Sequence, residues 1–148
     1  MDQKTASRRQ PDRLLLDLLG AAHALEARVE EAFAGVGLSW ARYGVLEQLA
    51  QAGEALSLGE LAARLTCVRS NMTQLVDKLE ADGLVRRLAD PADRRSVLAE
   101  LTPQGRESQA RGGEELRRVG AEFSAGLGRN GRTALQGLVA TLAGPGPV

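Results

Sequence analysis

The chain has 148 residues, of which 43% are hydrophobic and 26% are charged, and this composition is typical of one folded domain rather than a disordered segment. Its 19 basic and 19 acidic side chains balance, and no run of about 18 apolar residues is present, so we expect no membrane span. The start, MDQKTASRRQPD, lacks the apolar segment of a signal peptide and is expected to be a loose polar tail. The single cysteine, Cys67, cannot form an internal disulfide. We therefore expect a cytoplasmic protein with a single domain over residues 1–148.

The first predicted helix covers residues 13–34, because apolar side chains recur there at helical spacing. These side chains are Leu14, Leu15, Leu18, Ala22, Leu25, Val29, Ala32 and Phe33. The segment GVGLS interrupts the pattern. Ser39 is then a suitable N-cap for a second helix, WARYGVLEQLAQAG, which Gly53 closes.

The next segment predicts a helix-turn-helix. Ser57 and Glu60 have the spacing of a capping box at the start of a short helix, LGELAARL. A break at TCVR separates it from a third helix, which runs to about Asp82 and ends at Gly83. The face of this third helix that we expect to be buried carries Met72, Leu75, Val76 and Leu79.

The opposite face of the third helix is polar. It carries Ser70, Thr73, Gln74 and Asp77, with Asn71 beside them. Such side chains are poor helix formers, but they are suited to hydrogen bonds with phosphates and base edges. Because Asp77 would repel phosphate, we expect it to pair with an arginine or lysine within the domain.

Two short strands, GLVRRLAD and SVLAELT, are predicted around a hairpin at residues 89–97. The hairpin, ADPADRRSV, contains the Asp and Pro that a turn needs. A turn does not need the adjacent Arg94 and Arg95. These arginines are therefore either solubilising charge or contacts to an anion.

A further helix is predicted from Thr102, with Pro103 at its first position. Its apolar stripe is Leu116, Val119, Phe123 and Leu127, and Gly112, Gly113 and Gly120 lie inside it, so we expect it to be bent or locally loose. After GLGRNGR, a last helix carries Leu135, Leu138, Val139 and Leu142, and GPGPV is expected to fray. The predicted fold class is mainly α, an α+β winged helix.

Three segments in this order and spacing resemble the MarR family of bacterial transcription regulators. They are TQLVDKLEADGLV, DPADRR and LTPQG. The resemblance is close over residues 38–105 and extends to the flanking helices in arrangement only. It implies a winged helix-turn-helix DNA-binding lobe over residues 38–102, with dimerisation helices over residues 12–36 and 103–144.

The resemblance also implies how DNA would be bound. A homodimer would place each recognition helix in the major groove of a pseudo-palindromic double-stranded operator, and repression is the usual outcome in the family. The contacts would come from Arg69, Ser70, Asn71, Thr73 and Gln74, although Arg69 could instead be a surface charge. Arg95 matches the wing arginine that enters the minor groove, and Asp93 matches the acid that orients it. Arg94 would meet the DNA backbone.

Members of the family respond to aromatic acids or other small anions in a cleft between the two lobes, which implies an unknown small-molecule effector here. Trp40 is a pocket candidate, and Tyr43 is either a pocket or a core residue. Arg42 could meet a carboxylate or remain a surface arginine. His23 lies off the apolar stripe of its helix, which is more typical of a solvated or interface residue than of a ligand-binding one. One histidine and one cysteine are too few for a metal site, so we expect neither metal nor cofactor.

Within this family, redox sensing is an alternative to sensing a small molecule. Cys67 precedes the recognition helix, where the helix N-terminus and Arg69 would favour its thiolate, so the chain could sense oxidants. Redox sensing is a secondary hypothesis, because Cys67 could simply be a small buried residue that fills the turn. The segment PDRLLLDLL, where the family's sensing cysteine lies, contains none.

Outside the family, a winged helix could serve only for protein contact, but such a surface normally carries apolar or aromatic anchors. We expect no enzyme, because the one histidine is far from Cys67 in sequence and no Gly-rich phosphate loop is present.

Overall fold

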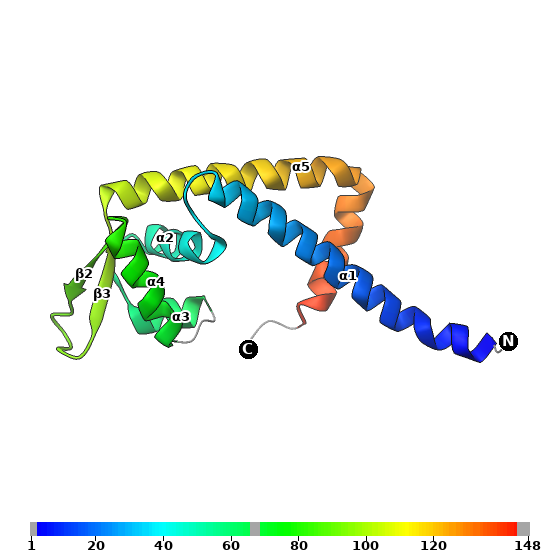
Figure 1. Ribbon diagram of the computed structural model, residues 1–148, viewed down its shortest axis with the longest axis horizontal. Coiled ribbons are helices and arrows are strands. Elements are labelled where there is room, and N and C mark those ends of the chain that lie inside the picture. Colours follow the sequence, from blue (N-terminus) through cyan, green and yellow to red (C-terminus); the bar gives the residue numbers. More distant parts are fainter. Residues whose placement is uncertain (1–2, 66–68, 145–148) are drawn as a thin grey trace.

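A computed structural model describes residues 3–65 and 69–144 as a mostly helical chain with one small antiparallel sheet (Figure 1). The elements are α1 (Gln3–Ala34), α2 (Trp40–Ala52), β1 (Leu56–Ser57), α3 (Leu58–Arg64), α4 (Arg69–Ala81), β2 (Val85–Ala89), β3 (Val97–Leu101) and α5 (Pro103–Leu142). This order confirms the predicted winged helix with flanking helices. In the described part of the chain, no helix is long and apolar enough to cross a membrane.

The first helix is longer than its apolar stripe predicts. Its backbone is helical from Gln3, so the expectation of a loose tail through Asp12 was wrong. The segment before Pro11 consists mainly of Gln, Lys, Ala and Arg, which have favourable helix propensity without forming an apolar face. Pro11 lies inside the helix rather than before it.

The core lies in the winged helix-turn-helix lobe, where α2, α3 and α4 pack together with the sheet. Met72, Val76 and Leu79 of α4 are fully buried, and Leu75 is partly buried against them, which confirms the predicted buried face. Aliphatic side chains dominate this core, since the whole chain has only four aromatic residues. The lobe therefore buries α4 on one face and leaves its polar face outward.

The predicted helix caps are present. Ser57 Oγ accepts a hydrogen bond from the backbone N–H of Glu60 at 3.1 Å, and Glu60 Oε2 accepts one from the backbone N–H of Ser57 at 2.8 Å. Ser39 caps α2, which Gly53 ends in a left-handed conformation, and Thr102 caps α5. These local signals fix where the helices of the lobe begin and end.

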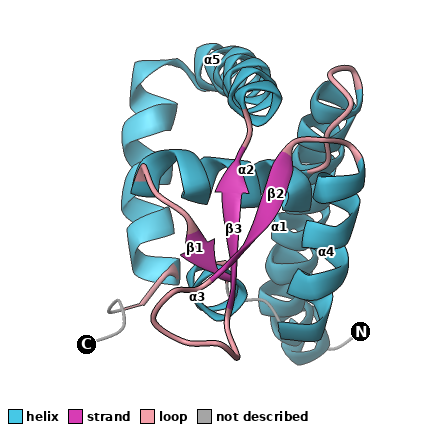
Figure 2. Ribbon diagram, turned by 90° about the vertical axis from the view of Figure 1, so that its left-hand side faces the viewer, coloured by secondary structure: helices cyan, strands magenta, loops and turns pink. Residues whose placement is uncertain are grey.

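The sheet has the strand order β1-β3-β2, with both pairs antiparallel (Figure 2). The β2–β3 hairpin runs from the pair Val85–Leu101 to the pair Ala89–Val97. Strand β1 was not predicted, because two residues are too few to show an alternating pattern. Its pairing with β3 attaches the start of α3 to the wing.

Helix α5 has two limbs, residues 103–127 and 129–142, which meet at a sharp turn (Figure 1). The break is at Gly128, whose φ of 67° and ψ of 178° are not helical. It falls inside GLGRNGR, where the sequence predicts the start of a separate last helix. The expectation of a bend around Gly112, Gly113 and Gly120 was wrong, because the backbone there is helical. Packing explains Gly112, since it is buried where a Cβ would clash with the ring of Tyr43.

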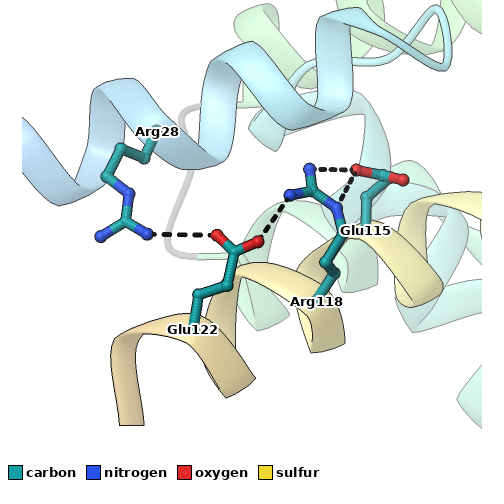
Figure 3. Close-up of polar contacts among 4 residues, drawn as sticks. All are labelled: Arg28, Glu115, Arg118 and Glu122. Atoms are coloured by element: carbon teal, nitrogen blue, oxygen red, sulfur yellow. Dashed lines mark hydrogen bonds and ion pairs between the residues drawn. The ribbon is translucent and has the colours of Figure 1, made fainter. Parts of the chain in front are cut away.

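The terminal helices are joined by a chain of charges (Figure 3). Arg28 of α1 lies 3.4 Å from Glu122 of α5, and Arg118 bridges Glu122 at 3.1 Å and Glu115 at 2.6 Å. These side chains are substantially exposed, so solvent screens the pairs and each adds little to stability. The network therefore orients α1 along α5 more than it stabilises the fold.

The packing of α5 gives a matched pair of substitutions. In Gly112→Ala, the new Cβ would lie 2.6 Å from Tyr43 Cδ2 and 2.9 Å from Leu38 Cδ1. We expect the free energy of unfolding to fall by about 1–3 kcal/mol. In Gly120→Ala, the Cβ would meet nothing within 4 Å, and better helix propensity should stabilise the protein by up to about 1 kcal/mol. Urea unfolding of both variants checks this, and equal effects would contradict the packing role of Gly112.

Candidate nucleic-acid interface

The polar face of α4 is exposed at its N-terminal end. Asn71, Thr73 and Gln74 are all exposed, as the sequence predicts for side chains that contact a partner. Arg69 and Ser70 begin the same helix, but their side chains lie outside the described part of the chain. The helix therefore presents amide and hydroxyl groups to solvent, where they can donate to and accept from an incoming polar surface.

Arg87 of β2 joins the hairpin to the recognition helix. Its guanidinium forms ion pairs with Asp77 and, at 3.3 Å, with Glu80, and it donates to the carbonyl of Thr73 at 3.4 Å. The expectation that Asp77 pairs within the domain is thereby confirmed. The two acids on α4 are balanced by a fixed cation, so their repulsion of a phosphate is reduced.

The hairpin tip is shaped by two aspartates. Asp90 Oδ1 accepts from the backbone N–H of Ala92, and Asp93 Oδ1 accepts from the backbone N–H of Arg95, each at 2.9 Å. Arg94 and Arg95 are exposed, and neither guanidinium forms an ion pair within the residues that the structure describes. Asp93 therefore holds the backbone of the tip, and its predicted action on the Arg95 side chain stays a prediction.

Arg42 of α2 ties that helix to the C-terminal end of α4. Its guanidinium forms an ion pair with Asp82 and donates to the carbonyls of Lys78 at 3.4 Å and Gly37 at 3.5 Å. The sequence left open a surface role or a contact with a bound carboxylate. The structure shows a contact inside the protein, which no local pattern signals because Lys78 and Asp82 are thirty-six and forty residues away.

A cavity of about 650 Å³ lies between α2, α4 and α5. Its lining includes the predicted pocket residues Trp40 and Tyr43, together with Ala41, Gly44, Glu47, Gln48, Leu65, Asn71, Met72, Leu75 and Leu116. Tyr43 also has a core role, because its ring is 8% exposed and stacks on Phe33 with centroids 4.8 Å apart. Trp40 is 54% exposed, so its ring remains accessible.

Two further candidates from the sequence are His23 and Cys67. His23 is exposed on α1, with Nδ1 3.5 Å from Glu26, and does not line the cavity. Cys67 lies outside the described residues, so its redox role stays a prediction. Within the described part of the chain, no group of three His, Cys, Asp or Glu side chains could hold a metal ion.

Glu47 is a site residue that the sequence analysis missed. Its Oε2 accepts from Gln109 of α5 at 2.7 Å and from the Tyr43 hydroxyl at 3.0 Å, while Oε1 accepts from Gln51 at 2.8 Å. These bonds lower the pKa of Glu47, the bond from Gln109 most, although partial burial opposes the shift. Burial and the bond to Glu47 raise the pKa of Tyr43. The spacing of Tyr43 and Glu47 on one helix face was the available signal.

The chain is similar in sequence and structure to known transcription regulators. A family model described as the MarR family matches residues 38–97. A putative transcriptional regulatory protein for the hcr operon of Thauera aromatica is 34% identical over 106 residues, which are 72% of this chain and 63% of that protein. The matched segments span roughly half to two thirds of the first curated relatives, from 46% to 63% of their lengths.

Two solved structures of proteins named CouR are also similar. The repressor bound to a 23-mer DNA duplex is 33% identical with a TM-score of 0.77, covering 86% of this chain and 89% of that one. CouR from Rhodococcus jostii RHA1 bound to p-coumaroyl-CoA is 27% identical with a TM-score of 0.70, covering 90% of this chain and 92% of that one.

The Glu47 network predicts a pH dependence of stability. Because the pKa of Glu47 is lower in the folded than in the unfolded chain, its stabilising effect is fully present above the ordinary value of 4.5 and is lost as the pH falls through the folded pKa. The difference in free energy of unfolding between wild type and Glu47→Gln should therefore be constant near neutral pH and shrink below about pH 4.5. Urea unfolding over a pH series measures it. Glu54→Gln removes an exposed carboxylate outside this network, and an identical pH profile for both variants would refute the prediction.

Proposed function

The chain belongs to the MarR family, and from this premise we propose that it is a transcription regulator that binds double-stranded DNA as a homodimer. Helix α4 would enter the major groove, and the wing tip would reach the adjoining minor groove. The observation that carries the proposal is that Arg94 and Arg95 are exposed and form no ion pair in the described part of the chain. They lie on a hairpin tip whose backbone is held by hydrogen bonds to Asp90 and Asp93.

The surroundings of these arginines support a DNA-binding surface that consists of the wing tip and the polar end of α4. The polar end of α4 lies in the same lobe, and Arg87 fixes α4 to β2 through Asp77 and Glu80. Helix and wing can therefore meet a duplex as one rigid unit. A guanidinium on a narrow tip suits the negative potential of a narrow minor groove.

The dimer is proposed from exposed leucines on the terminal helices. Large apolar side chains are exposed on α1 and on the last limb of α5, namely Leu14, Leu15, Leu16, Leu18, Leu19, Leu138, Val139 and Leu142. Figure 1 shows the N-terminal part of α1 extending away from the rest of the chain. Exposed apolar surface on this scale favours an interface, and a second copy would bury it with two-fold symmetry. Such a dimer would recognise a pseudo-palindromic operator.

We further propose that the protein is a repressor released by a small molecule in the cleft between α2, α4 and α5. Asn71, Met72 and Leu75 of α4 form part of its lining, so an occupant would contact the recognition helix directly. An effector that fits the cleft in only one orientation of α4 would shift the population of that orientation and change DNA affinity.

Arg95→Ala tests the wing. We expect its affinity for the DNA upstream of the protein's own coding sequence to fall on the order of tenfold or more, and the salt dependence of binding to become less steep. Fluorescence anisotropy at several salt concentrations, with unrelated DNA as competitor, measures both. Arg111→Ala removes an exposed arginine of α5 as the matched control. Equal affinity of wild type and Arg95→Ala would exclude the proposed role of the wing.

Leu15→Glu and Leu142→Glu test the dimer. Each would place a charge in the proposed apolar interface, so we expect the dimer dissociation constant to rise by about a hundredfold. Sedimentation equilibrium measures the constant. Val97→Glu charges an exposed apolar position of the wing and serves as the control. A wild-type protein that sediments as a monomer at micromolar concentration would rule out this assembly.

A further inference from the structure

We propose that the cleft between α2, α4 and α5 takes a hydrophobic organic cation, a compound with an apolar body and a protonated amine, rather than an aromatic acid. This inference rests on the proposed function, because it names the chemical class of the effector. It departs from the expectation that the family resemblance raised. The inference is argued from the charge of the side chains that line the cleft.

The lining is apolar apart from a few polar groups. Met72, Leu75 and Leu116 supply aliphatic surface from α4 and α5, and Gln48 and Asn71 supply neutral amides. Within the described residues, no arginine, lysine or histidine lines the cavity. A carboxylate ligand would therefore lose its hydration without gaining a cationic partner there.

Among the described residues, the one charged group of this lining is the carboxylate of Glu47. Its three hydrogen-bond donors, the Tyr43 hydroxyl and the amides of Gln51 and Gln109, are all neutral. They orient the carboxylate and favour its ionised form, but they leave its charge uncompensated. A carboxylate offers about four lone-pair positions, so one more donor can be accepted. A ligand ammonium would supply both the donor and the opposite charge.

Neither Arg42 of α2 nor Arg117, whose charge acts on Tyr43 of α2, supplies this charge. Arg42 begins on the same helix but is ion-paired with Asp82 and bonded to backbone carbonyls. Arg117 of α5 is exposed and near enough to Tyr43 to oppose the rise in its pKa, yet it does not line the cavity. A ligand carboxylate would thus meet the like charge of Glu47 across an apolar space.

The cleft is large enough for a small molecule, and a tryptophan in its lining allows binding to be followed by fluorescence. Its volume of about 650 Å³ is in the ordinary range for small-molecule sites. Trp40 lines it and is the only tryptophan of the chain, so its emission responds to an occupant. Trp40 also borders a second pocket beside Glu26 and Glu30 of α1, and the cleft variants described below distinguish the two sites.

The experiment compares three probes of equal shape and different charge. They are 3-phenylpropylamine, 3-phenylpropionamide and 3-phenylpropionate, titrated against the full-length protein while Trp40 emission is followed. We expect the amine to bind at least about tenfold more tightly than the acid, with the amide between them. Tighter or equal binding of 3-phenylpropionate would overturn the proposal. So would the failure of all three probes to change Trp40 emission at millimolar concentration.

Variants assign the preference to Glu47. Glu47→Gln should bring the affinities of amine and acid to within about threefold of each other. Gln48→Arg keeps the Glu47 network and adds a cation to the lining, so it should raise the affinity for 3-phenylpropionate about tenfold even if Glu47→Gln fails to fold. Glu54→Gln is the charge-matched control and should leave the order of the probes unchanged. An unchanged order in both cleft variants would overturn the assignment.

Operator binding is measured on the same preparations by anisotropy. Loss of the expected probe order with intact, sequence-specific DNA binding would overturn this inference alone. The expected probe order in a protein that binds no DNA specifically would overturn the proposed function and leave the ligand class standing.

Discussion

The ring of Tyr43 lies where three helices meet, and the arrangement of the two lobes depends on its packing. One face stacks on Phe33 of α1, and the ring edge lies against the α5 backbone at Gly112, where a Cβ would approach to 2.6 Å. Its hydroxyl donates to Glu47, which also accepts from Gln109 of α5. This joint holds the terminal helices to the winged helix-turn-helix lobe. Because α2 carries both Tyr43 and Glu47, it also forms one wall of the cleft.

Although the net charge of the chain is zero, the arginines of the hairpin differ in whether an acidic side chain pairs with them. In the hairpin, Arg86 pairs with Glu100 at 2.6 Å, and Arg87 pairs with acids of α4. Arg94 and Arg95 at the tip have no such partner in the described part of the chain. The paired arginines hold the wing in place, and the unpaired ones give its tip a local positive charge. A basic surface can therefore exist on a neutral protein, since local potential depends on where charges lie rather than on their sum.

Features set by neighbouring residues could be predicted from the sequence, and those set by distant contacts could not. The caps at Ser57 and Thr102 and the buried face of α4 follow from spacing within a few residues. The role of Gly112 could not be predicted, because glycine lowers helix propensity whether or not a ring packs on it. Glu47 was missed for a similar reason, since its strongest donor, Gln109, lies on another helix sixty-two residues away.

Helix α4 is fastened to α2 and to the wing, and this bears on how a ligand could control DNA binding. Its C-terminal half is held by Arg42 at Asp82 and by Arg87 at Asp77 and Glu80. Its N-terminal half carries the polar side chains proposed to meet DNA, and residues of that half also line the cleft. Arg87 of the wing also donates to the carbonyl of Thr73 in the N-terminal half, so helix and wing are joined as one unit. A molecule in the cleft would therefore shift helix and wing together relative to α2 and α5. In the proposed dimer, such a shift would change the separation of the two recognition helices, which must match the spacing of the half-sites on one duplex.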